Sequence, residues 1–137
     1  MSARRLVYAI STAIAVAAFV GSGVANLLRV EHVGTDMARL GYPPYLMTVL
    51  GTWKVLGAFA IAAPGLSRAK EWAYAGMIFD LTGAAASRGA VADGLGAVLA
   101  PIAVAFIVVA SWASRPPARM LQGQPDADRV AARAEVA

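Results

Sequence analysis

The segments GTWKVLGAFAIAA (residues 51–63) and EWAYAGMIFDLTGAAASR (residues 71–88) decide the fold, since each is largely apolar with one charge near its centre. Between them lies PGLSRAKE (residues 64–71), a polar stretch that begins with proline and glycine, so the pattern predicts an antiparallel helical hairpin. Lys54 lies ten residues before Pro64, and Asp80 nine residues after Glu71. With a helical rise of about 1.5 Å per residue, both charges lie at nearly the same depth. We therefore expect Lys54 and Asp80 to meet.

The composition indicates a membrane protein. The 137 residues are 59% hydrophobic and only 15% charged, whereas soluble domains average about 25% charged residues. The mean hydropathy is +0.63. Four apolar stretches approach the ~20 residues that cross ~30 Å of hydrocarbon, at residues 6–28, 45–63, 72–89 and 97–113. The sequence thus predicts an all-α fold, in which residues 1–115 form one four-helix transmembrane bundle and residues 116–137 a flexible cytoplasmic tail.

The basic residues are distributed unequally between the two predicted sides of the bundle. One side holds Arg4, Arg5, Arg68, Lys70, Arg115, Arg119, Arg129 and Arg133, and the other holds Arg29, Arg39 and Arg88. The positive-inside rule therefore places both termini in the cytoplasm of a multi-pass protein. Because the basic side chains are explained by the membrane, a lipid bilayer is the expected partner and nucleic acid is not.

The charged pair is the first candidate site. Inserting a lone lysine or aspartate at the bilayer centre costs about 2.5 to 3.5 kcal/mol of free energy. Pairing Lys54 with Asp80 offsets part of this insertion cost. The pair is either a structural ion pair that fixes the hairpin register or a site for protons, a polar head group or an acid–base step. In the second case Lys54 and Asp80 are the candidate catalytic residues. Small residues accompany the charges at helical spacing, so we expect the two small-residue faces to contact each other. The first face holds Gly51, Lys54 and Gly57, and the second face holds Gly76, Asp80, Gly83 and Ser87.

Further polar and aromatic residues are candidate ligand contacts. Trp53 and Phe79 each adjoin a charge and are candidates to flank a planar ligand, although such rings also serve as core or lipid contacts. Ser22 and Asn26 lie on a mildly polar stripe of the first helix, where the alternative is helix packing. Ser87 and Arg88 lie at the far end of the third apolar stretch, and Arg88 either receives an anionic or carbonyl group or extends to the interface.

Several kinds of site are excluded or disfavoured. The chain has no cysteine, so disulfides, thiolate nucleophiles and cysteine-held iron–sulfur clusters are excluded. The single histidine, His32, is not grouped with other ligands, and no metal or haem is expected. It lies in residues 29–44, where Val33, Met37 and Leu40 have the spacing of a short amphipathic surface helix.

The motifs LGYPPYL (40–46), GTWKVLGA (51–58), PGLSRAKEWAYAG (64–76) and FDLTGA (79–84) resemble the DoxX-like family of small four-helix bacterial membrane proteins. The resemblance covers about residues 6–115 and implies a location in the bacterial inner membrane. The family pattern usually has a histidine after the serine that corresponds to Ser87, whereas this chain has Arg88. If that histidine transfers protons in the family, this chain lacks the group.

The resemblance implies a quinone or another isoprenoid-like molecule in the bundle, because the family is named for its similarity to a membrane subunit of thiosulfate:quinone oxidoreductase. Three hypotheses follow. In the first, the protein is a ligand-binding or redox-associated membrane subunit that assembles as a homo-oligomer or with a redox partner protein. In the second, it is a small membrane enzyme in which Asp80 performs acid–base isomerisation or elimination on a lipophilic substrate. In the third, it is a non-catalytic interaction or chaperone-like scaffold.

Overall fold

The computed structural model describes residues 2–121, and this part of the chain is helical throughout, without strands. The helices are α1 (Ala3–Leu27), α2 (Glu31–Arg39), α3 (Tyr45–Ala62), α4 (Ser67–Ala90) and α5 (Leu95–Ala113), followed by the short 3-10 helix η1 (Pro117–Arg119). Residues 122–137 of the predicted tail lie outside the described residues. The all-α prediction is confirmed, and α2 is the short amphipathic helix expected between the first two long helices.

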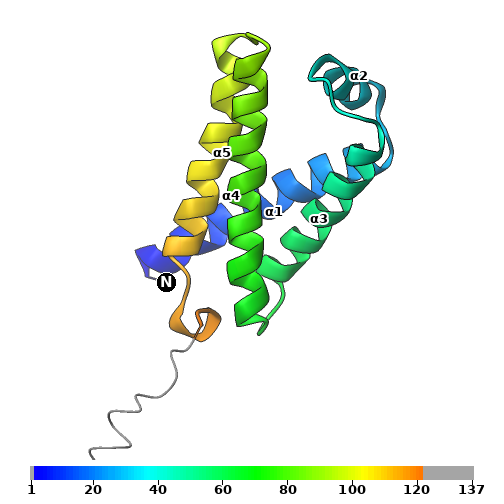
Figure 1. Ribbon diagram of the computed structural model, residues 1–137. Coiled ribbons are helices and arrows are strands. Elements are labelled where there is room, and N and C mark those ends of the chain that lie inside the picture. Colours follow the sequence, from blue (N-terminus) through cyan, green and yellow to red (C-terminus); the bar gives the residue numbers. More distant parts are fainter. Residues whose placement is uncertain (1, 122–137) are drawn as a thin grey trace, which may run out of the picture.

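The long helices form two pairs. Figure 1 shows α4 beside α5 as one pair, and α1 with α3 as a second pair that crosses the first. The α1–α3 contact is close because two glycines meet in it: a Cβ atom added to Gly51 would lie 2.8 Å from the carbonyl oxygen of Gly23. Small residues allow this approach of two backbones, which brings α1 and α3 into extensive contact.

The two ends of the bundle carry different elements. We call the end with α2 and the α4–α5 loop the α2 end, and the end with the start of α1, the α3–α4 turn and the close of α5 the N-terminal end (Figure 1). At the N-terminal end, Arg4 donates to the carbonyl oxygen of Arg115 at 2.9 Å and Arg119 donates to the hydroxyl of Tyr8 at 3.1 Å. These contacts hold the start of α1 against the segment that follows α5.

Three helices are long and apolar enough to cross a membrane, namely α1, α3 and α5. The sequence predicted four spans, and α4 is the one outside this group. It has 24 residues, more than the ~20 needed, but it carries the charges of Asp80 and Arg88 within its apolar stretch. The three apolar helices therefore indicate a membrane protein. Helix α4 has the length of a membrane span, although its composition is less apolar.

The start of α4 differs from the prediction, which began this helix at residue 72. The helix begins at Ser67, and Lys70 is fully buried instead of standing in a polar turn. Its ammonium group donates to the carbonyl oxygens of Ala60 at 2.8 Å and Ile61 at 3.0 Å, and also to that of Ala63. These carbonyls end α3 and have no partners within that helix, so Lys70 satisfies them and joins the two helices.

The apolar core lies between α1, α4 and α5, with part of α3. Its buried members are Ala15, Phe19, Ala58, Ile61, Tyr74, Met77, Leu81 and Val108. On its N-terminal side, the hydroxyl of Ser111 bonds to both Tyr74 and Thr12 at 2.7 Å. Burial of these three hydroxyls is compensated by their mutual hydrogen bonds, so this cluster is a satisfied structural feature.

Candidate functional site

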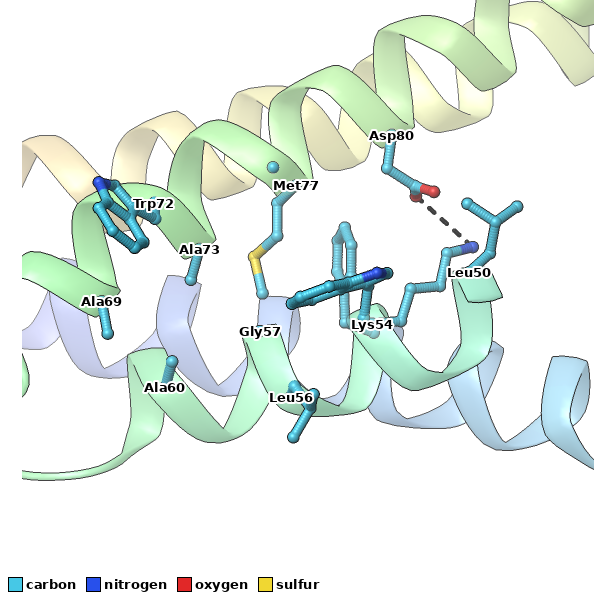
Figure 2. A pocket seen from close by; sticks show the side chains of 13 residues that line it. Leu50, Lys54, Leu56, Gly57, Ala60, Ala69, Trp72, Ala73, Met77 and Asp80 are labelled. Carbon is cyan, nitrogen blue, oxygen red and sulfur yellow. Dashed lines mark ion pairs between the residues drawn. The ribbon is translucent and has the colours of Figure 1, made fainter. Parts of the chain in front are cut away.

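The two intramembrane charges meet, as the sequence predicted. Lys54 Nζ on α3 lies 3.5 Å from Asp80 Oδ2 on α4, and the side chains are 18% and 19% exposed. Figure 2 shows the two groups facing each other across the gap between these helices. Within residues 2–121, neither group accepts or donates a hydrogen bond to another side chain or to the backbone. The ion pair therefore retains most of its capacity for hydrogen bonding.

An apolar groove extends from the ion pair towards the N-terminal end, between α3 and α4. Its volume is about 490 Å³, within the size range of small-molecule sites. In Figure 2 it runs from Lys54 and Asp80 to Ala60, Ala69 and Trp72 at the other end. Its remaining lining is almost wholly aliphatic or aromatic: Phe19, Leu50, Trp53, Leu56, Gly57, Ala73, Gly76 and Met77. Apart from the ion pair at one end, no charged side chain of residues 2–121 lines this groove.

A second cavity, of about 540 Å³, extends from the same ion pair towards the α2 end. We call it the polar cavity. Its hydrophilic lining residues come from α1 to α4 and the loop before α3, and they are Ser22, Asn26, His32, Asp36, Tyr42, Lys54, Asp80, Ser87 and Arg88. Leu50, Lys54 and Asp80 line both cavities. The ion pair is thus the junction between an apolar and a polar space.

Asn26 is the most buried polar residue of the polar cavity. It is 3% exposed, and its amide makes no hydrogen bond with any described residue. Ser22, one turn earlier in α1, also lines the cavity and likewise does not bond to the described part of the chain. Among the described residues, the fully enclosed polar side-chain atom without a partner is Nη1 of Arg115, so the amide of Asn26 is open to the cavity that it lines.

Ser87 and Arg88 have partners of their own. The Ser87 hydroxyl bonds to Tyr42 and donates to the carbonyl oxygen of Gly83 at 2.9 Å. Arg88 donates to Asp36 at 2.9 Å and to Asp93 at 3.0 Å. Both residues line the predicted site, but their polar atoms are already engaged, unlike those of Ser22 and Asn26.

The contacts of Arg88 belong to a ring of four charges at the α2 end. Arg39 makes a two-pronged ion pair with Asp93 and also lies 3.4 Å from Asp36, so each arginine contacts both aspartates. Hydrogen bonding from Arg39 lowers the pKa of Asp93, and hydrogen bonding from Arg88 lowers the pKa of Asp36. The ring ties α2, which has no buried residues, to the end of α4 and the following loop.

The two aromatic candidates lie at different cavities. Trp53 is 68% exposed and lines the apolar groove, together with Trp72, whereas Phe79 is 75% exposed and lines the polar cavity. They therefore do not face each other across one ligand. Trp72, which is 79% exposed, lines the same groove at the end away from the ion pair (Figure 2).

The predicted contact between the two small-residue faces holds only in part: Lys54 meets Asp80 and Gly57 lies against Met77 of α4, but the other glycines do not meet across the helices. Gly51 packs on α1, where its nearest atoms belong to Gly23 and Leu27. Gly76 and Gly83 of α4 have open space where a Cβ atom would stand, and they line the groove and the polar cavity respectively. The small residues of α4 thus create room between the helices instead of close packing.

A family model described as the DoxX-like family matches residues 10–111 of the chain. The match includes the ion pair, both aromatic candidates and the polar residues of α1 and α4 that line the cavities. A search of curated proteins and a search of solved structures give no match. Since the matched region covers most of the chain and carries the motifs of the hairpin, the chain belongs to the DoxX-like family of membrane proteins.

Proposed function

We propose that the protein binds a lipophilic small molecule with one polar end, such as a quinone-like or isoprenoid compound, between α3 and α4. The observation that carries the proposal is the ion pair Lys54–Asp80, which stands at the head of an apolar groove with its hydrogen-bonding capacity unused. An intramembrane ionisable pair of this kind is expensive without partners, and its position suits the recognition of a polar group.

The groove fits the apolar part of such a molecule. It is long, lined by aliphatic side chains and open along one side between α3 and α4, where Trp53 and Trp72 are exposed. A molecule dissolved in the bilayer therefore reaches it without crossing water. The indole rings offer flat surfaces for a ring or a chain, which favours planar or isoprenoid groups over a globular ligand.

The polar end is held by groups of opposite character. The ammonium of Lys54 donates to a carbonyl or hydroxyl oxygen, and the carboxylate of Asp80 accepts from a hydroxyl. Asn26 and Ser22 supply a further amide and hydroxyl from α1. A quinone-type compound bound there supplies redox chemistry through its own ring, while the residues bind it, orient it and exclude water from the apolar side.

We further propose that this protein is a multi-pass subunit of the bacterial inner membrane, with α4 as its fourth span and both termini in the cytoplasm. The excess of lysine and arginine at the N-terminal end supports that orientation. A redox partner protein or a second copy would complete the assembly if the bound molecule carries electrons.

A second candidate function is acid–base catalysis on a lipophilic substrate. It is favoured by Asp80, whose carboxylate reaches both cavities and is not hydrogen-bonded to any described residue. In this role Asp80 takes or gives the proton, and Lys54 lies 3.5 Å away as its counter-ion.

The test is mass spectrometry of the lipid-soluble molecules that copurify with the protein in mild detergent. The variants are Asp80→Asn, Lys54→Met and Gly76→Leu, the last of which fills the groove at a position with no atoms within 4 Å. Gly21→Leu is the matched control, because Gly21 also has open space but lies outside both cavities.

We expect one quinone or isoprenoid compound in the wild type and in Gly21→Leu, and its loss from the other three variants at equal folded yield. Acid–base catalysis would instead show as a compound that accumulates chemically unchanged on Asp80→Asn. Ordinary phospholipids alone in every sample would contradict ligand binding and leave the ion pair as a structural contact in a scaffold protein.

A further inference from the structure

The polar cavity extends away from the groove and reaches the surface of the protein. We propose that it is a water-filled path through which Asp80 and Lys54 exchange protons with the aqueous phase on the α2 side only. This inference concerns the access of water and protons and stands independently of the ligand. Only its consequence for a bound molecule rests on the proposed function.

Polar side chains from several elements line the polar cavity, among apolar neighbours such as Leu46, Leu50 and Phe79. His32 and Tyr42 are exposed, and Asn26 is buried. A space of about 540 Å³ with this many polar groups is large enough for several waters. Waters there supply the hydrogen bonds that Asn26 and the ion pair do not obtain from the described residues.

All helices around the ion pair contribute polar groups on the α2 side. The titratable or charged groups that face this space are His32 and Asp36 of α2, Tyr42 of the loop before α3, Lys54 of α3, and Asp80 and Arg88 of α4, while α1 contributes the neutral Ser22 and Asn26. Asp36 and Arg88 are already paired in the ring of four charges, and the Tyr42 hydroxyl is bonded to Ser87. His32 and Asp80 therefore remain as the groups able to pass a proton along this path.

The route from the ion pair to the N-terminal end is closed to water. The groove on that side is apolar, and the buried core residues Phe19, Met77 and Ile61 lie between the ion pair and the N-terminal polar cluster. Behind the ion pair, the contact of Gly23 with Gly51 leaves no space between α1 and α3. Water thus reaches the ion pair from one side, and lipid-soluble molecules reach it from the other.

In this arrangement, Asp80 can transfer a proton between a molecule in the groove and water in the polar cavity. The carboxylate of Asp80 accepts a proton from a hydroxyl of a molecule in the groove: an O–H bond breaks on the molecule and one forms on Asp80, while the molecule keeps the electron pair as an oxyanion beside the ammonium of Lys54. Asp80 then releases that proton to water in the polar cavity, and the carboxylate is restored next to Lys54. No electron is transferred in this step, and the reverse sequence delivers a proton from the α2 side.

The absence of native cysteine allows a direct test. Single cysteines at Ser22 in the polar cavity, Ala60 in the groove and Gly21 on the lipid-facing surface of α1 are placed in oriented membrane vesicles. Each variant is treated from one side at a time with a membrane-impermeant, positively charged methanethiosulfonate. Because only the thiolate reacts and an apolar setting suppresses it, we expect Ser22→Cys to react at least about tenfold faster than the other two.

The side of the membrane from which the reagent reaches the cysteine also tests the proposal. Ser22→Cys should react with reagent on the α2 side alone, and the added change Gly83→Leu, which fills the polar cavity where Gly83 has open space, should slow it. Equal rates for Ser22→Cys and Gly21→Cys, or reaction of Ser22→Cys from the N-terminal side, would overturn the proposal.

Protonation of Asp80 is followed by its infrared carboxyl band, assigned as the band that Asp80→Asn lacks. We expect this band to respond to the pH of the α2-side buffer and not to that of the other side; a response to the other side would contradict the one-sided path. The groove variant Gly76→Leu separates the two proposals. If Gly76→Leu loses the ligand while Ser22→Cys is labelled at its normal rate, ligand binding and the water path are both supported. If the ligand binds but Ser22→Cys is not labelled, only the water path is refuted.

Discussion

Lys54 Nζ lies 3.5 Å from Asp80 Oδ2, at a point where an apolar groove and a polar cavity share these two side chains as walls. The distance is short enough for an ion pair and leaves room for further partners on both groups. A structural ion pair would be completed by the protein itself. This pair instead faces two spaces of opposite polarity, which is the basis of the functional proposal.

Removing either charge of this pair should destabilise the protein more than removing both. Lys54→Met and Asp80→Leu each leave a lone charge within the apolar bundle, and we expect each to cost about 2 to 3 kcal/mol. The double variant leaves no lone charge and should lose less than either single variant. Thermal unfolding in detergent measures the three values, and strictly additive losses would show that the two charges do not interact.

Gly51→Ala should separate α1 from α3. The added Cβ atom would lie 2.8 Å from both the Gly23 carbonyl oxygen and Leu27 Cγ, and backbone cannot move aside cheaply. We expect a loss of about 1 to 3 kcal/mol in unfolding free energy, as for other overpacked contacts. Gly76→Ala is the control, because its site is open and it should not destabilise the protein. Equal melting temperatures for the two variants would refute the close contact.

Lys70→Met should weaken the joint between α3 and α4. The substitution leaves the terminal carbonyl oxygens of Ala60 and Ile61 without their donor, and a hydrogen bond from a charged group is worth about 1.5 to 3 kcal/mol. We therefore expect lower thermal stability for Lys70→Met than for Arg68→Met, since Arg68 is exposed in the same turn of α4. A fall of similar size in Arg68→Met would point to a loss of surface charge instead.

Acid should release α2 from the end of α4. Contacts with Arg88 and Arg39 lower the pKa values of Asp36 and Asp93, so their ion pairs stabilise α2 above the ordinary aspartate pKa of about 3.9. This stabilisation is lost as pH falls through the lower folded-state values. A spin label on Ala38→Cys, an exposed position of α2, should gain mobility only in that acidic range.

The same label on Gly21→Cys in α1 is the control and should keep its mobility. Release of α2 between about pH 5 and pH 8 would contradict the assignment, because neither aspartate changes its charge there.

The meeting of Lys54 with Asp80 was predicted from nearly equal counts to a turn placed at residues 64–71, and the ion pair confirms it. The counts themselves are not equal, because α3 ends at Ala62 and α4 begins at Ser67, so Lys54 lies 8 residues (62 − 54) and Asp80 13 residues (80 − 67) from the turn. The long side chains and the crossing of the helices, and not equal depth alone, bring the charges together. The faces of the helices were less predictable. Periodicity shows that Gly51 and Lys54 lie within one turn of each other, but it does not show that Gly51 contacts α1 while Lys54 contacts α4.

Lys70 shows a second limit of the sequence. A lysine in a polar stretch after proline and glycine is normally exposed, and only the return of α4 against the end of α3 makes it a donor to unpaired carbonyls. The ring of four charges has the same origin. Asp36 and Arg88 are far apart in the chain, and their charges balance only because α2 lies over the end of α4.

The sequence by itself determined the membrane setting, the helical composition and the hairpin, because hydropathy and helix-breaking residues act along the chain. The tertiary structure alone decided that the glycines of α4 open two cavities, that one is apolar and the other more polar, and that Lys54 and Asp80 lie where they meet. Cavities arise from the crossing of helix pairs, and that crossing depends on contacts between residues distant in the sequence.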